Sequence, residues 1–101
     1  MNKLKKSNNF PLIHPGTILK EEVLNVSGLT VTGAADMLKI SRPMLSNIIN
    51  GKSAITASMA IRIAAVFGGS PDVWVNLQSA YELRKAEMEF AVHPVKFQSV
   101  A

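Results

Sequence analysis

The chain contains 101 residues, 48% of them hydrophobic, which suits a single domain with one modest core. Eleven basic and seven acidic residues give a formal net charge of +4, which alone is only a weak argument for a polyanionic partner. Cysteine is absent, which excludes disulfides, thiolate chemistry and cysteine-bound metals. The apolar runs are short and the N-terminal lysines precede polar residues. We therefore expect no membrane span, no signal peptide and a cytoplasmic location.

Residues 1–12 are expected to form a flexible basic arm, because Lys3, Lys5 and Lys6 lie there without an acid. Such an arm sometimes follows a DNA backbone, although a solvated terminus is the simpler interpretation. The folded domain is predicted to cover residues 13–89.

The first predicted helix opens at His14 and Pro15, since proline suits the first helical position. Its apolar face includes Leu19 and Val23, and a Ser-Gly pair should end it. His14 is a lone histidine at a helix start. We interpret it as a cap or a packing residue rather than as a ligand or a general base.

Residues 31–51 form the central motif, two short helices joined by a tight turn. Thr30 and Ser41 are suitable N-caps for the two helices. Pro43 falls in the first turn of the second helix, where its missing N–H costs nothing, and Gly51 can adopt the left-handed conformation that follows a helix. Apolar residues recur at helical spacing, namely Ala34, Ala35 and Leu38, then Leu45, Ile48 and Ile49.

The opposite side of the second helix is polar and free of acids. No acid occurs between Lys39 and Lys52, and residues 29–53 carry three cations against one acid, a net charge of +2. The outward residues are Arg42, Pro43, Ser46, Asn47 and Asn50, with Met44 at the boundary. Arginine, asparagine and serine hydrogen-bond base edges and phosphates. The pattern predicts a helix-turn-helix whose recognition helix begins at Arg42.

The next predicted helix begins after the cap Thr56 and ends at Gly68. Met59 and Ile63 lie on one face, and Arg62 is the only charged residue. We therefore expect this helix to be buried on nearly all sides, at the centre of the core.

The last predicted helix runs from Pro71, after the N-cap Ser70, to about Glu89. Trp74 and Tyr81 are assigned to the core by default, because aromatic residues at helical spacing pack inside more often than at interfaces. The charged second half is expected to project beyond the core and to offer a partner surface. Residues 90–101 are apolar and are predicted to form a short extended tail that folds back or contacts a second subunit, with a disordered tail as the alternative.

The chain carries no GxSxG, HExxH, Walker A or GxGxxG motif. His14 and His93 lie far apart in the sequence, and Asp36 and Asp72 lie near helix starts, where solvation is the usual state. We expect no enzyme, no cofactor and no bound metal.

From His14 to about Glu87 the chain resembles the HigA-type antitoxins, which belong to the Cro/C1-type (XRE) helix-turn-helix proteins and have VapI-like relatives, and three segments are the most specific. They are HPG at 14–16, INGKSAIT at 49–56 and FGGSPDVWVNLQ at 67–78. The resemblance implies an all-α fold, a compact five-helix domain with a lambda repressor-like helix-turn-helix. It also implies a homodimer that binds double-stranded operator DNA, represses its own operon and neutralises a cognate toxin, typically a RelE-like (HigB-like) mRNA endoribonuclease.

The resemblance and the outward helix face together define the expected DNA-binding surface. Arg42 and the amides would contact bases, while lysines and threonines would hold phosphates. The surface comprises Thr30, Thr32, Lys39, Ser41, Arg42, Pro43, Met44, Ser46, Asn47, Asn50 and Lys52.

Three features depart from the pattern of these relatives. Relatives often carry more arginine in the recognition helix, where this chain has only Arg42, so operator affinity is expected to be modest or to depend on dimer avidity. Val31 replaces a glutamine that bonds a phosphate, so that contact is either missing or made by Thr30 or Thr32. Lys39 replaces a glycine in the turn, and a lysine forced to positive φ costs about 1 kcal/mol.

Two other functions remain open. A stand-alone XRE repressor, for example of phage origin, would keep the DNA-binding surface but have no toxin gene beside it. A protein-binding module that has lost DNA binding would fail to bind any duplex at low salt.

Overall fold

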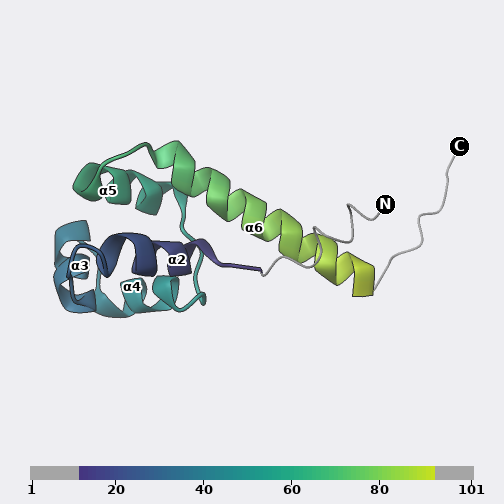
Figure 1. Ribbon diagram of the computed structural model, residues 1–101, viewed down its shortest axis with the longest axis horizontal. Coiled ribbons are helices and arrows are strands. Elements are labelled where there is room, and N and C mark those ends of the chain that lie inside the picture. The colour runs from purple at the N-terminus through teal and green to yellow at the C-terminus, as the bar shows by residue number, and fades with distance from the viewer. Residues whose placement is uncertain (1–11, 93–101) are drawn as a thin grey trace, which may run out of the picture.

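The computed structural model describes residues 12–92, and within that range every regular element is helical. The elements are α2 (Pro15–Ile18), η1 (Leu19–Leu24), α3 (Val31–Leu38), α4 (Arg42–Ile49), α5 (Ala57–Phe67) and α6 (Pro71–Val92). Helices α2, α3 and α4 cluster together, α5 lies beside the start of α6, and α6 runs on past the other helices (Figure 1). The expectations for the arm and for residues 93–101 of the tail lie outside the described residues.

The first predicted helix is one continuous segment in which α2 passes directly into the π-helical η1. The sequence did not predict the π-helical turns. Asn25 donates its backbone N–H to the carbonyl of Lys20 at 2.9 Å, five residues back. Because a π-turn closes over five residues, Leu19 and Leu24 lie one above the other, and both are buried.

The helix-turn-helix follows the sequence prediction closely. Its six predicted inward residues are all buried, from Ala34 to Ile49. They join one core with Leu19, Ile55 and Trp74 among others. Hydrophobic burial on this scale, at roughly 25 cal/mol per Å², is what holds helices of eight residues in place.

Helix α5 was predicted to be buried on nearly all sides, and this prediction is wrong. Met59, Ala60 and Ile63 are buried, but Ile61 is 59% exposed and Arg62 is also exposed. The prediction relied on composition alone. A helix with few charges is buried only where neighbouring elements pack against it. Here α3 and α6 cover one side of α5.

Helix α6 begins as predicted, with the Ser70 hydroxyl accepting from the backbone N–H of Asp72 at 3.2 Å. It continues to Val92 rather than ending near Glu89, so residues 90–92 are helical and not extended. After Pro71 the next proline or glycine is Pro94, and the residue that a proline directly keeps out of the helical region is the one before it. Trp74 lies in the core as predicted, while Tyr81 is only half-buried.

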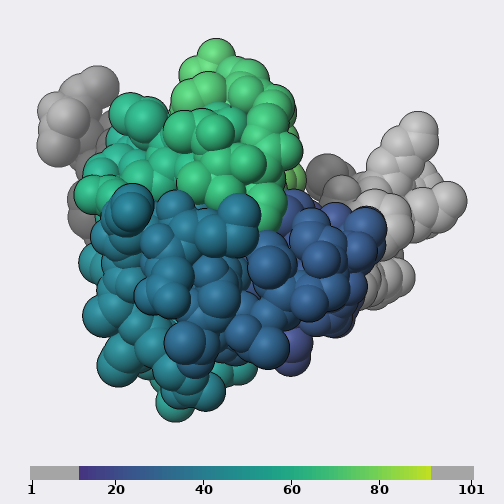
Figure 2. All heavy atoms as spheres, turned by 90° about the vertical axis from the view of Figure 1, so that its left-hand side faces the viewer, coloured from purple at the N-terminus to yellow at the C-terminus, as the bar shows by residue number. Residues whose placement is uncertain are grey.

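Within residues 12–92, most of the second half of α6 is exposed, as predicted. Leu83, Met88 and Phe90 are 62%, 41% and 56% exposed. Figure 2 shows the end of the molecule opposite to the C-terminal end of α6. There the atoms of the helix-turn-helix lie directly against those of α5 and the start of α6. No helix in the described part of the chain has the length and apolar character needed to cross a membrane.

Candidate nucleic-acid interface

Both helices of the motif begin at a side-chain cap, as predicted. Thr30 Oγ1 accepts from the backbone N–H of Gly33 at 3.0 Å, and Ser41 Oγ accepts from that of Met44 at 3.2 Å. These bonds satisfy N–H groups that have no partner within the helix. The hydroxyls of Thr30 and Ser41 are therefore already in use as caps.

The turn between the helices adopts a left-handed backbone conformation at Lys39, which is unfavourable for a lysine. Lys39 lies in the left-handed region at φ 62° and ψ 41° and is the only non-glycine residue with positive φ within residues 12–92. Position 39 does require positive φ, so lysine carries the expected cost of about 1 kcal/mol. The turn is consequently strained at the point where it directs the chain into α4.

Helix α4 exposes the side chains that the sequence placed outside. Arg42, Pro43, Asn47 and Asn50 are exposed and Met44 is 50% exposed. Ser46 is half-buried, and its Oγ accepts from Asn50 Nδ2 at 3.3 Å. This bond holds Ser46 and Asn50 against each other one helical turn apart.

The remaining predicted residues surround α4 and are all exposed. Lys39 precedes the helix, Lys52 follows it, and Thr30 and Thr32 begin α3. The structure therefore gathers the predicted residues into two groups, one along α4 with its flanking lysines and one at the start of α3.

The C-terminal end of α4 is held by a corner that the sequence analysis missed. A Cβ atom on Gly16 would collide with the backbone carbonyl of Ile48, so only glycine permits this approach of α2 to α4. Gly51 has φ 77°, and a Cβ atom added to it would lie 3.7 Å from the Cβ and Cγ atoms of His14. The HPG segment thus packs closely against the C-terminal end of α4.

His14 caps α2, as predicted. Its Nδ1 accepts from the backbone N–H of Gly16 at 2.8 Å, and its ring meets Tyr81 edge-on at a centroid distance of 4.8 Å. Burial lowers the pKa of His14, the charge of Lys85 lowers it further, and Glu82 opposes both. A neutral imidazole is required because Nδ1 must accept a hydrogen bond.

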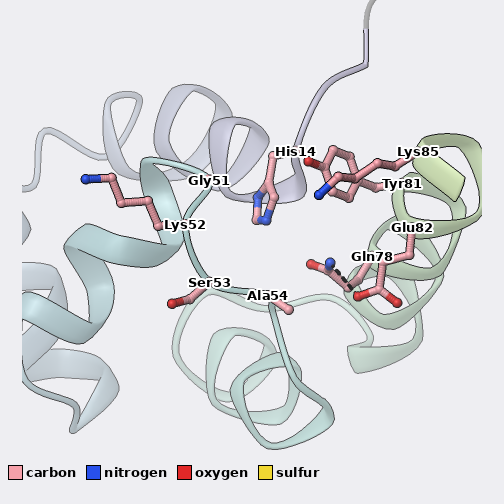
Figure 3. Close-up of a pocket in the computed structure, with 9 residues that line it drawn as sticks. All are labelled: His14, Gly51, Lys52, Ser53, Ala54, Gln78, Tyr81, Glu82 and Lys85. Atoms are coloured by element: carbon pink, nitrogen blue, oxygen red, sulfur yellow. Dashed lines mark hydrogen bonds between the residues drawn. The ribbon is translucent and has the colours of Figure 1, made fainter. Parts of the chain in front are cut away.

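A polar cavity of about 190 Å³ lies between His14, α6 and the segment that follows α4. Figure 3 shows the His14 ring between Gly51 and Tyr81, with the side chain of Lys52 directed away from His14. Gln78 Oε1 accepts from the backbone N–H of Ile55 at 2.8 Å, and its Nε2 donates to Glu82 at 3.0 Å. The sequence analysis did not single out Gln78.

Comparison with known proteins identifies the family. The model of a helix-turn-helix family matches residues 21–74. Virulence-associated protein I of Dichelobacter nodosus is 40% identical over 81% of this chain and 76% of its own length. The chain belongs to this helix-turn-helix family. Antitoxin HigA-1 of Vibrio cholerae is 36% identical over 79% of this chain and 74% of its own length.

A solved structure of the HigA antitoxin of Pseudomonas aeruginosa with the higBA promoter superposes with a TM-score of 0.78. It is 35% identical, and the match covers 85% of this chain and 97% of that one. These comparisons confirm the resemblance to HigA and VapI-like proteins and the all-α helix-turn-helix fold. The family consists of helix-turn-helix regulators and antitoxins and not of enzymes.

Proposed function

We propose that this chain is a DNA-binding antitoxin that represses its own operon and neutralises a RelE-like mRNA endoribonuclease. The outward face of α4 is the observation that carries the proposal, because it is exposed and acid-free and presents Arg42, Asn47 and Asn50. These side chains match the donor and acceptor groups of base edges in the major groove. The fold shared with an antitoxin whose structure contains its promoter supports the same function.

Phosphate contacts are expected on either side of α4. Lys39 and Lys52 would neutralise phosphates at the two ends of the helix, with Met44 and Pro43 against the groove wall. At α3, Gly33 and Ala34 already bond to Thr30, which leaves the first-turn N–H groups of Val31 and Thr32 for a phosphate. The backbone would thus supply the contact that a glutamine side chain makes in relatives.

A symmetric dimer would place two recognition helices about 34 Å apart, in successive major grooves of one duplex face. We assign the dimer contact to the second half of α6, where Leu83 and Phe90 expose apolar side chains seven residues apart. Two large apolar side chains exposed at a spacing of two helical turns lie on the same side of α6 and suit contact with a partner helix. Binding of the dimer over a promoter would block transcription by occlusion.

The dimer is tested by the double variant Leu83→Glu, Phe90→Glu, measured by sedimentation equilibrium. It should be monomeric at concentrations where the unmodified chain is dimeric, and it should bind promoter DNA more weakly because avidity is lost. Ile61→Glu, at an exposed apolar residue of α5, is the matched control and should leave the mass unchanged. A double variant that stays dimeric would move the interface away from this strip.

DNA binding is tested by titrating the full chain against the duplex upstream of its own gene and against a scrambled duplex, over a range of salt concentrations. Specific binding with a steep salt dependence is expected. Equal, weak binding to both duplexes would favour the protein-binding module.

Residue roles are separable in the same assay. Arg42→Ala or Asn47→Ala should reduce discrimination between bases, each by about 1–3 kcal/mol. Lys52→Met should weaken binding to every sequence and flatten the salt slope by about 1. Unchanged base preferences in the first two variants would contradict the assignment of α4 to base contacts.

Toxin neutralisation is tested by co-expressing the chain with the product of the neighbouring gene. Co-purification of the two chains and relief of mRNA cleavage are expected. Specific promoter binding without either result would identify a stand-alone repressor.

A further inference from the structure

Arg62 carries the only charge on α5, and its guanidinium lies at the end of a different helix. Its Nη1 donates to the backbone carbonyl of Leu38 at 3.0 Å and to that of Lys39 at 3.4 Å. In the sequence, Arg62 lies 24 positions after Leu38 and 23 positions after Lys39. It connects α5 to the turn between α3 and α4.

The two carbonyls are ones that the turn itself leaves without a backbone donor. The N–H groups of Lys39 and Ile40 bond back to the carbonyls of Asp36 and Ala35, at 3.2 and 3.0 Å. The last carbonyls of a helix have no intrahelical partners and form the negative end of its dipole. A cation placed there satisfies both requirements.

The same turn is strained, because Lys39 adopts a left-handed conformation that L-residues disfavour. A strained turn persists only when surrounding contacts hold it. Within residues 12–92, the Arg62 guanidinium is the side chain whose hydrogen bonds reach the carbonyl of Lys39. Its two bonds therefore oppose the tendency of Lys39 to leave this conformation.

We propose that Arg62 is a positioning residue for the recognition helix. It fixes the α3–α4 turn and thereby the angle at which α4 is presented, without contacting the nucleic acid. The inference rests on the proposed DNA-binding function and adds to it a residue from outside the helix-turn-helix. An open turn would lower the fraction of binding-competent protein, and the apparent affinity falls by that fraction.

The competing interpretation is a direct phosphate contact, since Arg62 is exposed and arginine binds phosphate well. Salt dependence separates the two roles, because each phosphate contact contributes about 0.9 to the slope of log K against log salt. A positioning residue changes the affinity and leaves the slope as it was.

The experiment compares Arg62→Met, Arg62→Lys and the control Lys52→Met on the duplex upstream of the chain's own gene, with unfolding midpoints recorded for each variant. Arg62→Met should weaken binding about three- to tenfold, as expected for lost hydrogen bonds, with the slope unchanged. The DNA affinity of Arg62→Lys should lie between those of the unmodified chain and Arg62→Met, since a lysine offers a point charge without the planar guanidinium group. Lys52→Met should lower both affinity and slope.

Lys39→Gly provides the decisive combination, because glycine adopts positive φ without strain. In the Lys39→Gly background, Arg62→Met should lose much less affinity than it does alone. An equal loss in both backgrounds, or a slope reduced by about 1 in Arg62→Met, would overturn the positioning role. An unchanged affinity would overturn it as well.

Amide hydrogen exchange tests the turn independently of DNA. In Arg62→Met the Ile40 N–H, bonded to Ala35, should exchange faster, while the Ala60 N–H, bonded to Thr56 at 2.8 Å, should not change. Failure of the unmodified chain to bind DNA would refute the proposed function alone. Unchanged exchange at Ile40 would refute the role of Arg62.

Discussion

Helices α4 and α6 are held in different ways. Helix α4 has eight residues and is fixed at both ends, by Ser41 and the Lys39 turn at its start and by the Gly16 and His14 corner at its end. Helix α6 has 22 residues, and within residues 12–92 its buried side chains, Trp74 and Gln78, lie in its first half. Burial of Leu45, Ile48 and Ile49 gives α4 one buried and one exposed side. Most residues in the second half of α6 are exposed, so their side chains are available for contact with a partner.

The difference suits the two proposed roles. Base recognition requires side chains held at fixed positions against a rigid duplex, which α4 provides by burying Leu45, Ile48 and Ile49. Contact with another protein chain tolerates a projecting helix such as the second half of α6, since the partner itself completes the packing.

The largest effect is expected from Gly16→Ala, which breaks the support at the end of α4. The added methyl group would collide with the carbonyl of Ile48, and such overpacking costs about 3 kcal/mol of unfolding free energy. Urea denaturation measures the loss. Gly28→Ala is the matched control, because Gly28 has positive φ with no atoms near its Cβ position and should cost only about 1 kcal/mol. Equal losses would show that the α2–α4 approach can relax.

Gln78→Ala tests the support that α6 receives from the α4–α5 connection. It would leave the buried N–H of Ile55 without its acceptor, at a cost of about 2 kcal/mol in the free energy of unfolding. Ser79→Ala, at the exposed neighbouring residue, should change stability by less than about 0.5 kcal/mol. If the two variants unfold alike in urea, Gln78 does not anchor α6.

Sequence reasoning predicted the parts of α4 that depend on local chemistry. Caps, the proline in the first turn and the glycine after the last turn act within a few residues, so Ser41 and Gly51 could be identified from their neighbours. The supports from Arg62, Gln78 and Gly16 could not, because each joins segments more than 20 residues apart. The prediction for α5 failed for the same reason, since burial depends on which elements lie beside a helix.

Lys39→Gly relaxes the turn that leads into α4. It should raise the free energy of unfolding by up to about 1 kcal/mol, because it removes the left-handed strain, with part of the gain lost to the greater backbone freedom of glycine when unfolded. Lys85→Gly, at an exposed lysine in a regular helix, should instead lower stability by about 1 kcal/mol. A destabilised Lys39→Gly chain would mean that the lysine side chain contributes contacts that outweigh its backbone strain.

The smallest expected effect concerns His14, whose ring meets Tyr81 of α6 and which lines the same cavity as Gly51, just after α4. Its pKa is lowered from the ordinary value of 6.5, so the unfolded chain binds a proton more readily than the folded chain. The neutral His14 ring therefore makes its full contribution to the free energy of unfolding above pH 6.5, and this contribution decreases as the pH falls below that value. Urea midpoints between pH 8 and pH 5 should decline for the unmodified chain relative to His14→Asn, whose amide can cap α2 without titrating. Because His93 is present in both chains, its own titration cancels in the difference. Parallel midpoints would mean that the pKa of His14 is the same in the folded and unfolded chains, and that the junction of α4 with α6 does not depend on its charge.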